Sequence, residues 1–355
     1  MCDPNSLISS SKTLDQLKTT TIGGFKKTNV INKLVEAFGN GNIESACYWS
    51  AQLLASGQLE DLWDTIICFA VKKIHNANPF MFPYLELRLE SLRNILSAVS
   101  GDTLNVRNDK AMRQLIAEVV VKITLSKKGN PIVAVKVDKT DYDLIRLSEK
   151  LKAPDLTYIT DLMRKDDAQE LIVALNEMCY HLSNDSKDSV AAYYWIEWIM
   201  QFDTVCRKKK TNCSCAARCI ETIDVKHQKD PIWLVWEILI KHAFDRQPPL
   251  ILKIVRSLFE LYRSRYSLAQ KKKRRLMLYF VINLITQSLD SVKSVDTNKE
   301  AVEHTVKNID AVYIQIAKDC NKETVEPKVN KPITAEEKRR IKMDALLKVG
   351  STKLL

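Results

Sequence analysis

The chain has 355 residues, of which only 8 are Gly and 10 are Pro. Folds rich in β-sheet need many tight turns, and those turns use Gly and Pro for specific backbone reasons. Their scarcity therefore argues against sandwiches, propellers, Rossmann folds and barrels, and it predicts an all-α protein. Hydrophobic residues make up 46% of the chain and charged residues 27%, which is enough apolar mass for one large core or two smaller ones.

The net charge of +11 is unevenly distributed along the chain. Residues 1–204 carry a net charge of −3, whereas residues 205–355 carry +14. Such an asymmetry indicates a polyanionic partner for the basic half, either nucleic acid or an anionic membrane surface. The alternative is that the abundant Lys serves only to keep the surface soluble.

Helical periodicity begins after a segment rich in Ser, Thr and Lys. Residues 1–27 show little periodicity, so we interpret them as an extended N-terminal arm. Residues 28–150 form a first helical unit, whose helices are predicted from apolar spacing and from Gly and Pro at their ends. These predicted helices cover residues 30–38, 43–56, 59–74 and 83–99.

The motifs of this first unit return in the same order in residues 151–320. The matched segments are 46–49 with 192–195, 62–67 with 235–240, and 84–92 with 250–258. We interpret the chain as internally duplicated, with two helical bundles of antiparallel neighbours packed as a pseudo-symmetric pair. The alternative is a chance likeness between two sets of amphipathic helices.

Residues 110–125, between the copies, allow two interpretations. Their apolar positions fit a helical stripe, which we favour. The alternative is a β-hairpin with strands at 119–121 and 132–137 around the turn Lys127–Asn130.

The composition changes again after Cys320. Residues 321–355 form a basic C-terminal tail, with a Pro-containing linker followed by a short helix at 334–348 that opens with a capping box. We expect this tail to be a second arm, ordered only by a partner.

Motifs of known enzyme classes are missing from the sequence. It contains no Gly-rich phosphate loop, no H-E-x-x-H, no EF-hand loop and no nucleophile elbow. His75 and His242 end matching apolar helices, where the helix C-terminus accommodates an imidazolium. We therefore expect no catalytic residues and no enzymatic activity.

The nine Cys follow an N-terminus that lacks a basic-then-apolar leader, so we expect no signal peptide and synthesis in a reducing cytosol. Four of these thiols lie close together, at Cys206, Cys213, Cys215 and Cys219. They could hold a structural zinc ion tetrahedrally, although the paired C-x2-C of common zinc modules is missing. The alternatives are free thiols in a basic loop, or a disulfide formed after release from the cell.

Two basic runs are the candidate polyanion-facing or membrane-facing residues. They comprise Arg207, Lys208, Lys209, Lys210, Lys271, Lys272, Lys273, Arg274 and Arg275. Such runs can neutralise phosphates, with an affinity that falls as salt rises, or they can attract an anionic membrane. The six Trp lie on apolar helix faces rather than among these runs, so we expect electrostatic docking without sequence-specific recognition. The longest apolar runs are too short to span a bilayer.

Three segments carry a resemblance to a known family. They are Glu44–Gly57 (ESACYWSAQLLASG), Leu62-Trp63 with Ile74–Pro79 (IHNANP), and Lys229–Trp236 (KDPIWLVW). They resemble an α-helical virion family of nucleocytoplasmic large DNA viruses of the algal-virus and mimivirus kind. The resemblance spans about residues 28–290 and rests on aromatic packing motifs.

This resemblance implies a structural role and supplies no catalytic residues. It implies a minor capsid protein, made in the host cytoplasm and incorporated in the virion, that links capsomers beneath the outer shell. Its partners would be the major capsid protein, other minor capsid proteins and an anionic inner membrane surface. The alternative function is sequence-independent nucleic-acid binding during viral replication or genome packaging.

Overall fold

The computed structural model describes most of the chain as helices. The described residues are 8–10, 12–99, 104–142, 144–211, 213–245, 249–287 and 298–323. Within these ranges the chain forms α-helices joined by turns and short 3-10 segments, with one π-helical turn at Ala70–Ile74 and no β-sheet. The prediction of an all-α fold is confirmed. None of the described helices combines the length and the apolar character that crossing a bilayer requires.

The first bundle contains five helices. They are α1 (Lys27–Asn40), α2 (Ile43–Ala55), α3 (Leu59–Phe69), α4 (Met81–Ala98) and α5 (Lys110–Leu125). The helix ends follow the local sequence: Gly41 adopts a left-handed conformation after α1, with φ of 71°, and the Asn42 side chain then accepts a hydrogen bond from the Ser45 amide at 3.0 Å. Asp109 caps α5 in the same way, through the Met112 amide at 2.7 Å.

The segment for which a hairpin was the alternative is helical. Val119 and Val121, which the hairpin would have placed on a strand, both lie within α5 and are buried. Residues 126–138 then cross to the second bundle without regular secondary structure. The helical interpretation is confirmed, because the apolar stripe of α5 packs on α1, α2 and α4.

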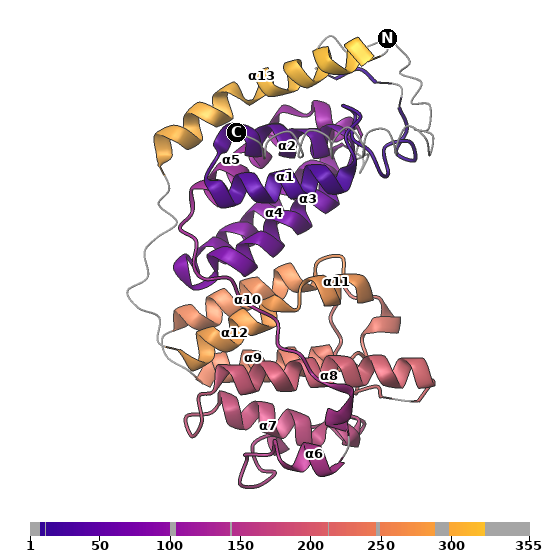
Figure 1. Ribbon diagram of the computed structural model, residues 1–355, viewed down its shortest axis with the longest axis vertical. Coiled ribbons are helices and arrows are strands. Elements are labelled where there is room, and N and C mark those ends of the chain that lie inside the picture. Colours follow the sequence, from indigo (N-terminus) through magenta and orange to yellow (C-terminus); the bar gives the residue numbers. More distant parts are fainter. Residues whose placement is uncertain are drawn as a thin grey trace, which may run out of the picture.

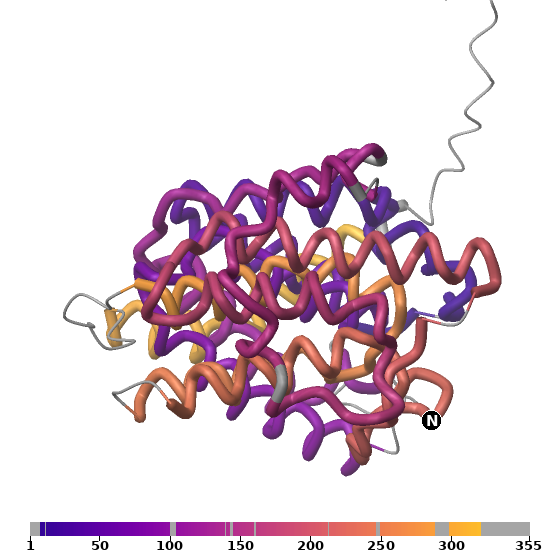
Figure 2. The backbone as a smooth tube through the Cα atoms, turned by 90° about the horizontal axis from the view of Figure 1, so that it is seen from below, coloured from indigo at the N-terminus to yellow at the C-terminus, as the bar shows by residue number. Residues whose placement is uncertain are grey.

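The second bundle has the same arrangement with longer connections. After the short α6 (Leu144–Ser148), its helices are α7 (Ile172–Leu182), α8 (Ser189–Lys209), α9 (Ile232–Asp245), α10 (Pro249–Arg263), α11 (Leu268–Lys273) and α12 (Leu276–Thr286). Trp195, Trp233 and Trp236 are almost completely buried, so they belong to its core. Figure 2 shows α7 and α8, drawn in rose tones, running side by side across the molecule.

Three of the helix pairs that pack in the first bundle have counterparts in the second. The pair α1–α2 corresponds to α7–α8, α2–α5 corresponds to α8–α12, and α4–α5 corresponds to α10–α12. The two bundles also meet through equivalent helices, since α4 packs directly on α10 (Figure 1). These matched contacts support the interpretation of an internal duplication arranged as a pseudo-symmetric pair.

The last described helix, α13 (Lys299–Glu323), belongs to the first bundle in space. The sequence assigned it to the second unit, but it lies across α5 and α2 at the far end of the molecule (Figure 1). Its buried residues Ile309, Tyr313 and Ile316 follow a helical spacing, and Arg113 of α5 pairs with Asp310 at 2.7 Å. The assignment of residues 299–320 is therefore corrected.

The N-terminal arm is also corrected where the structure describes it. Ile8, Leu17 and Ile22 are buried against the first bundle rather than extended toward a neighbour. The Gln58 side chain donates hydrogen bonds to the carbonyls of Leu17 and Thr20, which fastens the segment to the start of α3. Of the tail predicted at 321–355, residues 324–355 lie outside the described residues.

Candidate anion-binding groove

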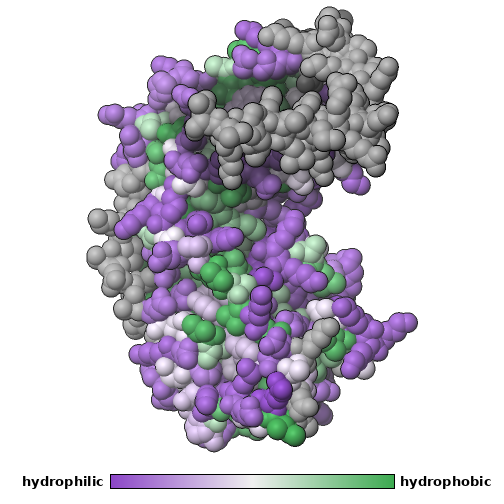
Figure 3. All heavy atoms as spheres, in the orientation of Figure 1, coloured by the Kyte–Doolittle hydropathy of each residue, from purple (hydrophilic) through white to green (hydrophobic). Residues whose placement is uncertain are grey.

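The fold brings the two basic runs together in one groove. It lies between the C-terminal half of α8 and the segment around α11, and it encloses about 510 Å³. Its lining includes five cationic side chains, Arg207, Lys208, Lys271, Lys272 and Arg275. The hydrophilic projection at the right of Figure 3 is the C-terminal end of α8, which carries the first run. Residues 64 positions apart in the sequence thus share one surface.

Lys271 serves as the floor of this groove and is buried. Its ammonium lies 2.7 Å from Asp203 and 2.6 Å from Asp230, and the Arg207 guanidinium contacts the same two carboxylates at 2.9 and 3.0 Å. Burial raises the pKa of Asp230, but the Lys271 ammonium and the hydrogen bonds outweigh it, so the net pKa lies below its usual range. The expectation that Lys271 faces a polyanion is corrected: its charge is used inside the protein.

Arg274 is buried at the junction of the bundles. Its guanidinium pairs with Asp64 of α3 at 2.6 Å and donates to the carbonyls of Leu261 and Tyr262 at 3.1 and 3.0 Å. Gln270 donates to the second oxygen of Asp64. Arg274 therefore joins the two bundles and does not face a polyanion, so the expectation for this residue of the second run is corrected as well.

The remaining cations are available to a ligand. Lys208, Lys209, Lys210 and Lys272 are exposed, and in the described part of the chain no carboxylate lies within ion-pair distance of them. Arg275 is half-buried and contacts Glu197 at 3.4 Å. Because the acidic residues of the floor are already paired, the rim of the groove keeps an uncompensated positive charge.

Glu197 lines the groove and is held by Tyr279, which is not itself a lining residue. The Tyr279 hydroxyl donates to Glu197 at 2.8 Å and accepts from the Val135 amide at 3.2 Å. The Tyr193 ring stacks on Tyr279 with 4.1 Å between ring centroids. Burial raises the pKa of Glu197, while the Tyr279 hydrogen bond and the Arg275 charge oppose that increase. The segment that links the bundles is thereby fixed to the wall of the groove.

The four clustered thiols do not converge. Cys206, Cys213 and Cys215 are buried, whereas Cys219 is exposed on the far part of the loop. The thiols of Cys206 and Cys213 are hydrogen-bonded, and burial and this contact raise the pKa of Cys213. Among the residues that the structure describes, no group of three or more His, Cys, Asp or Glu side chains is arranged to hold a metal ion.

The loop after α8 is instead held by an ion pair. Arg218 is buried and forms a two-point contact with Asp167, and it also reaches Glu237 at 2.9 Å. Asp167 in turn accepts from the amides of Ala216 and Arg164. This network of ion pairs and hydrogen bonds holds the loop after α8 in place.

The structure also shows a Ser–His–Glu series that the sequence did not reveal. Ser186 lies 2.9 Å from Nδ1 of His181, and Nε2 of His181 lies 3.6 Å from Glu177. The Glu177 carboxylate accepts from the backbone amides of Lys152 and Ala153 at 2.9 Å each. The series therefore fastens the turn after α7 and the segment before it to the helix.

Comparison with protein-family models, with curated proteins and with solved structures gives no match for this chain. The viral resemblance accordingly rests on the three sequence segments quoted above.

Proposed function

We propose that this chain is a non-catalytic structural protein, a minor capsid component that links capsomers beneath the outer shell of a large DNA virus. The observation that carries a docking role is the groove between α8 and α11, where Lys208 of the first run and Lys272 of the second line one surface and have no carboxylate within ion-pair distance in the described part of the chain. The virion assignment itself is supported by the family resemblance. Its partners would be the major capsid protein, other minor capsid proteins and the anionic surface of an inner membrane.

The joined bundles suit a spacer between two partners. α4 packs on α10, and Arg274 of the second bundle is paired with Asp64 of the first, so the bundles are fastened by both apolar and ionic contacts. The first bundle presents α13 on its outer side, and the second presents the basic groove. The groove lies around α11, beside the junction of the bundles, whereas α13 lies at the far end of the first bundle, so a protein of this form can contact two partners at separate surfaces.

Proteomics of purified virions tests the assignment. We expect this chain at a fixed stoichiometry to the major capsid protein, retained after nuclease treatment and lost when capsomers are dissociated. Absence of the chain from virions contradicts the proposal.

A second candidate is sequence-independent nucleic-acid binding, favoured by the exposed cations of Lys208–Lys210 and Lys272. Such binding weakens as salt increases, in proportion to the number of phosphates neutralised. The core positions of Trp195, Trp233 and Trp236 leave no base-stacking platform on those side chains. Binding to duplex DNA that the charge reversals Lys208→Glu and Lys272→Glu abolish, with unchanged stability, would favour this candidate over membrane or capsomer docking.

A further inference from the structure

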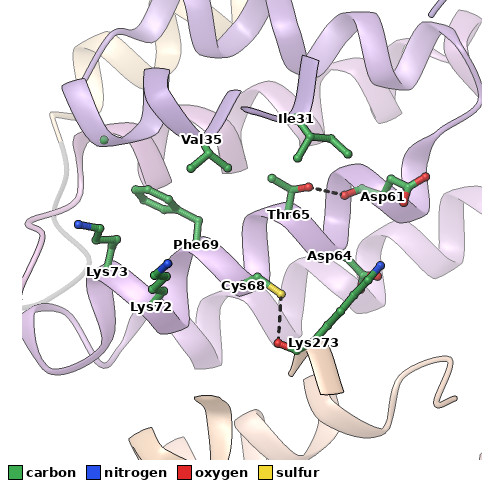
Figure 4. Close-up of a pocket in the computed structure, with 11 residues that line it drawn as sticks. Ile31, Val35, Asp61, Asp64, Thr65, Cys68, Phe69, Lys72, Lys73 and Lys273 are labelled. Carbon is green, nitrogen blue, oxygen red and sulfur yellow. Dashed lines mark hydrogen bonds between the residues drawn. The ribbon is translucent and has the colours of Figure 1, made fainter. Parts of the chain in front are cut away.

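The first bundle carries a separate groove with an apolar floor. It encloses about 480 Å³ between α1 and α3, and it shares no lining residue with the anion-binding groove. Figure 4 shows Ile31 and Val35 of α1 facing Thr65 and Phe69 of α3 across it. Val35 is 40% exposed although it points into the groove. The two helices therefore leave part of their apolar surface uncovered.

Charges at the edges of this groove are unbalanced. Its two carboxylates are already engaged, since Asp61 pairs with Lys27 at 2.8 Å and Asp64 pairs with Arg274 at 2.6 Å. Its three ammonium groups, on Lys72, Lys73 and Lys273, have no carboxylate within ion-pair distance in the described ranges. Figure 4 shows Lys72 and Lys73 at one end, while Lys273 enters from α11 at the other.

Gly39 keeps one end of the groove open. It is the last but one residue of α1, and a Cβ added there would meet no atom within 4 Å. Its position is helical rather than left-handed, so no backbone conformation requires Gly. Gly within a helix is less stable than Ala, because its backbone loses more conformational freedom. The missing side chain is therefore unexplained by the packing of the chain itself, and it leaves space for another molecule.

We propose that this groove binds an amphipathic helix of a partner protein, with an apolar stripe bordered by acidic side chains. A groove between two packed helices receives the side-chain ridge of a third helix, and such helices insert apolar residues spaced three and four apart. The unpaired lysines at both ends select carboxylates next to that stripe. Because Lys273 comes from the second bundle, the bound helix would contact both bundles.

A labelled peptide of about 18 residues, long enough for five helical turns, is the probe. It carries Leu at helical spacing with Glu on both sides of the stripe, and a matched peptide replaces each Glu by Lys. Fluorescence anisotropy with the full-length chain should show binding of the Glu peptide, with at least tenfold weaker binding of the Lys peptide. Equal affinities, or no binding of the Glu peptide, overturn the proposal.

Variants locate the binding. Gly39→Leu fills the open end while improving helix propensity, and we expect it to weaken binding at least tenfold, whereas Gly39→Ala adds only one methyl group and should retain most of the affinity. Lys273→Glu should weaken binding about tenfold, and the adjacent control Lys272→Glu, which lines the other groove, should leave it within twofold. If Gly39→Leu fails to fold by circular dichroism, the Lys273 and Lys272 pair decides alone.

Two other occupants are distinguished by the same variants. If phosphatidylglycerol vesicles bind the wild-type chain but not the Gly39→Leu variant, the occupant of the groove is a lipid surface rather than a helix. Self-association in sedimentation that Gly39→Leu abolishes would replace it by a second copy. Either result overturns the proposed partner.

Discussion

Replacing Lys271 by Met tests whether the basic run is partly a structural element. The side chain is 5% exposed, and its ammonium is shared by Asp203 and Asp230, of which Asp230 is fully buried. Removing one partner of a buried ion pair leaves an uncompensated charge and costs about 3–5 kcal/mol. Arg207 still contacts both carboxylates in the variant, so we expect the unfolding free energy to fall by about 3 kcal/mol, the lower end of that range.

Urea unfolding followed by Trp fluorescence measures this loss, and thermal unfolding should show a midpoint lower by about 4 °C, from the unfolding entropy of a chain of this length. The matched control is Lys272→Met, which removes the same charge from the neighbouring residue, whose side chain is exposed. It should change the unfolding free energy by less than about 0.5 kcal/mol. Equal effects of the two substitutions, or a loss under about 1 kcal/mol for Lys271→Met, would refute the assignment of Lys271 to the interior.

The pH dependence of the same variant has a defined sign. The pKa of Asp230 is lower in the folded protein than its usual value, so its ionisation stabilises the fold above about pH 4. That contribution is lost as the pH falls through the folded-state pKa. Lys271→Met removes the main charge that favours ionised Asp230. The difference in unfolding free energy between variant and wild type should therefore be constant near neutral pH, and it should narrow in acid as Asp230 becomes protonated.

Three further results are expected. Alkylation at pH 8 followed by peptide mass spectrometry should modify the exposed Cys219 well before Cys179, whose pKa burial raises to about 12; equal rates would contradict the burial. Arg274→Ala and Asp64→Asn, measured separately and together by urea unfolding, should show a coupling of about 1–3 kcal/mol across the bundle junction, whereas additive effects would mean that this ion pair does not help to hold the bundles together. Asp167→Asn should lower the unfolding free energy by about 3 kcal/mol at neutral pH. This loss should shrink below about pH 4, because the pKa of Asp167 is lowered in the folded protein. A loss that does not depend on pH would mean that Asp167 is not ionised in the fold.

Helix positions could be predicted because the apolar spacing and the breakers agree locally. The helix at 110–125 was identified from its stripe and is observed at the same bounds, and the turn at Gly41 follows from the need for a left-handed residue there. The third helix was predicted through Ile74, but it is α-helical only to Phe69 and continues as a π-helical turn. Spacing alone cannot distinguish these two windings over one turn.

Long-range placement could not be predicted in the same way. α13 follows the second bundle in sequence, yet it packs on the first, because its Tyr313 meets its partner Arg113 of α5 only in the folded chain. Ile8, Leu17 and Ile22 are separated by nine and five residues, which is no helical or strand period, so their burial left no pattern in the sequence. The arrangement of the four thiols could not be predicted for a related reason: proximity in sequence does not fix the direction of side chains on a helix end and a following loop.

The basic run at Lys271–Arg275 shows how both kinds of information combine. Lys271 and Arg274 are three residues apart, so they share one face of the short helical segment, and both are buried against carboxylates. Lys272 and Lys273 lie on the outer face, where one lines the groove beside α8 and the other the groove beside α3. The helical spacing alone would have separated an inner from an outer pair. Which pair faces inward depends on Asp64, Asp203 and Asp230, which lie 41 or more residues away in the chain. A run of basic residues therefore predicts a binding surface only for those side chains that have no carboxylate partner inside the protein. In this run Lys272 and Lys273 remain, each at the edge of a different groove, so each can be tested separately.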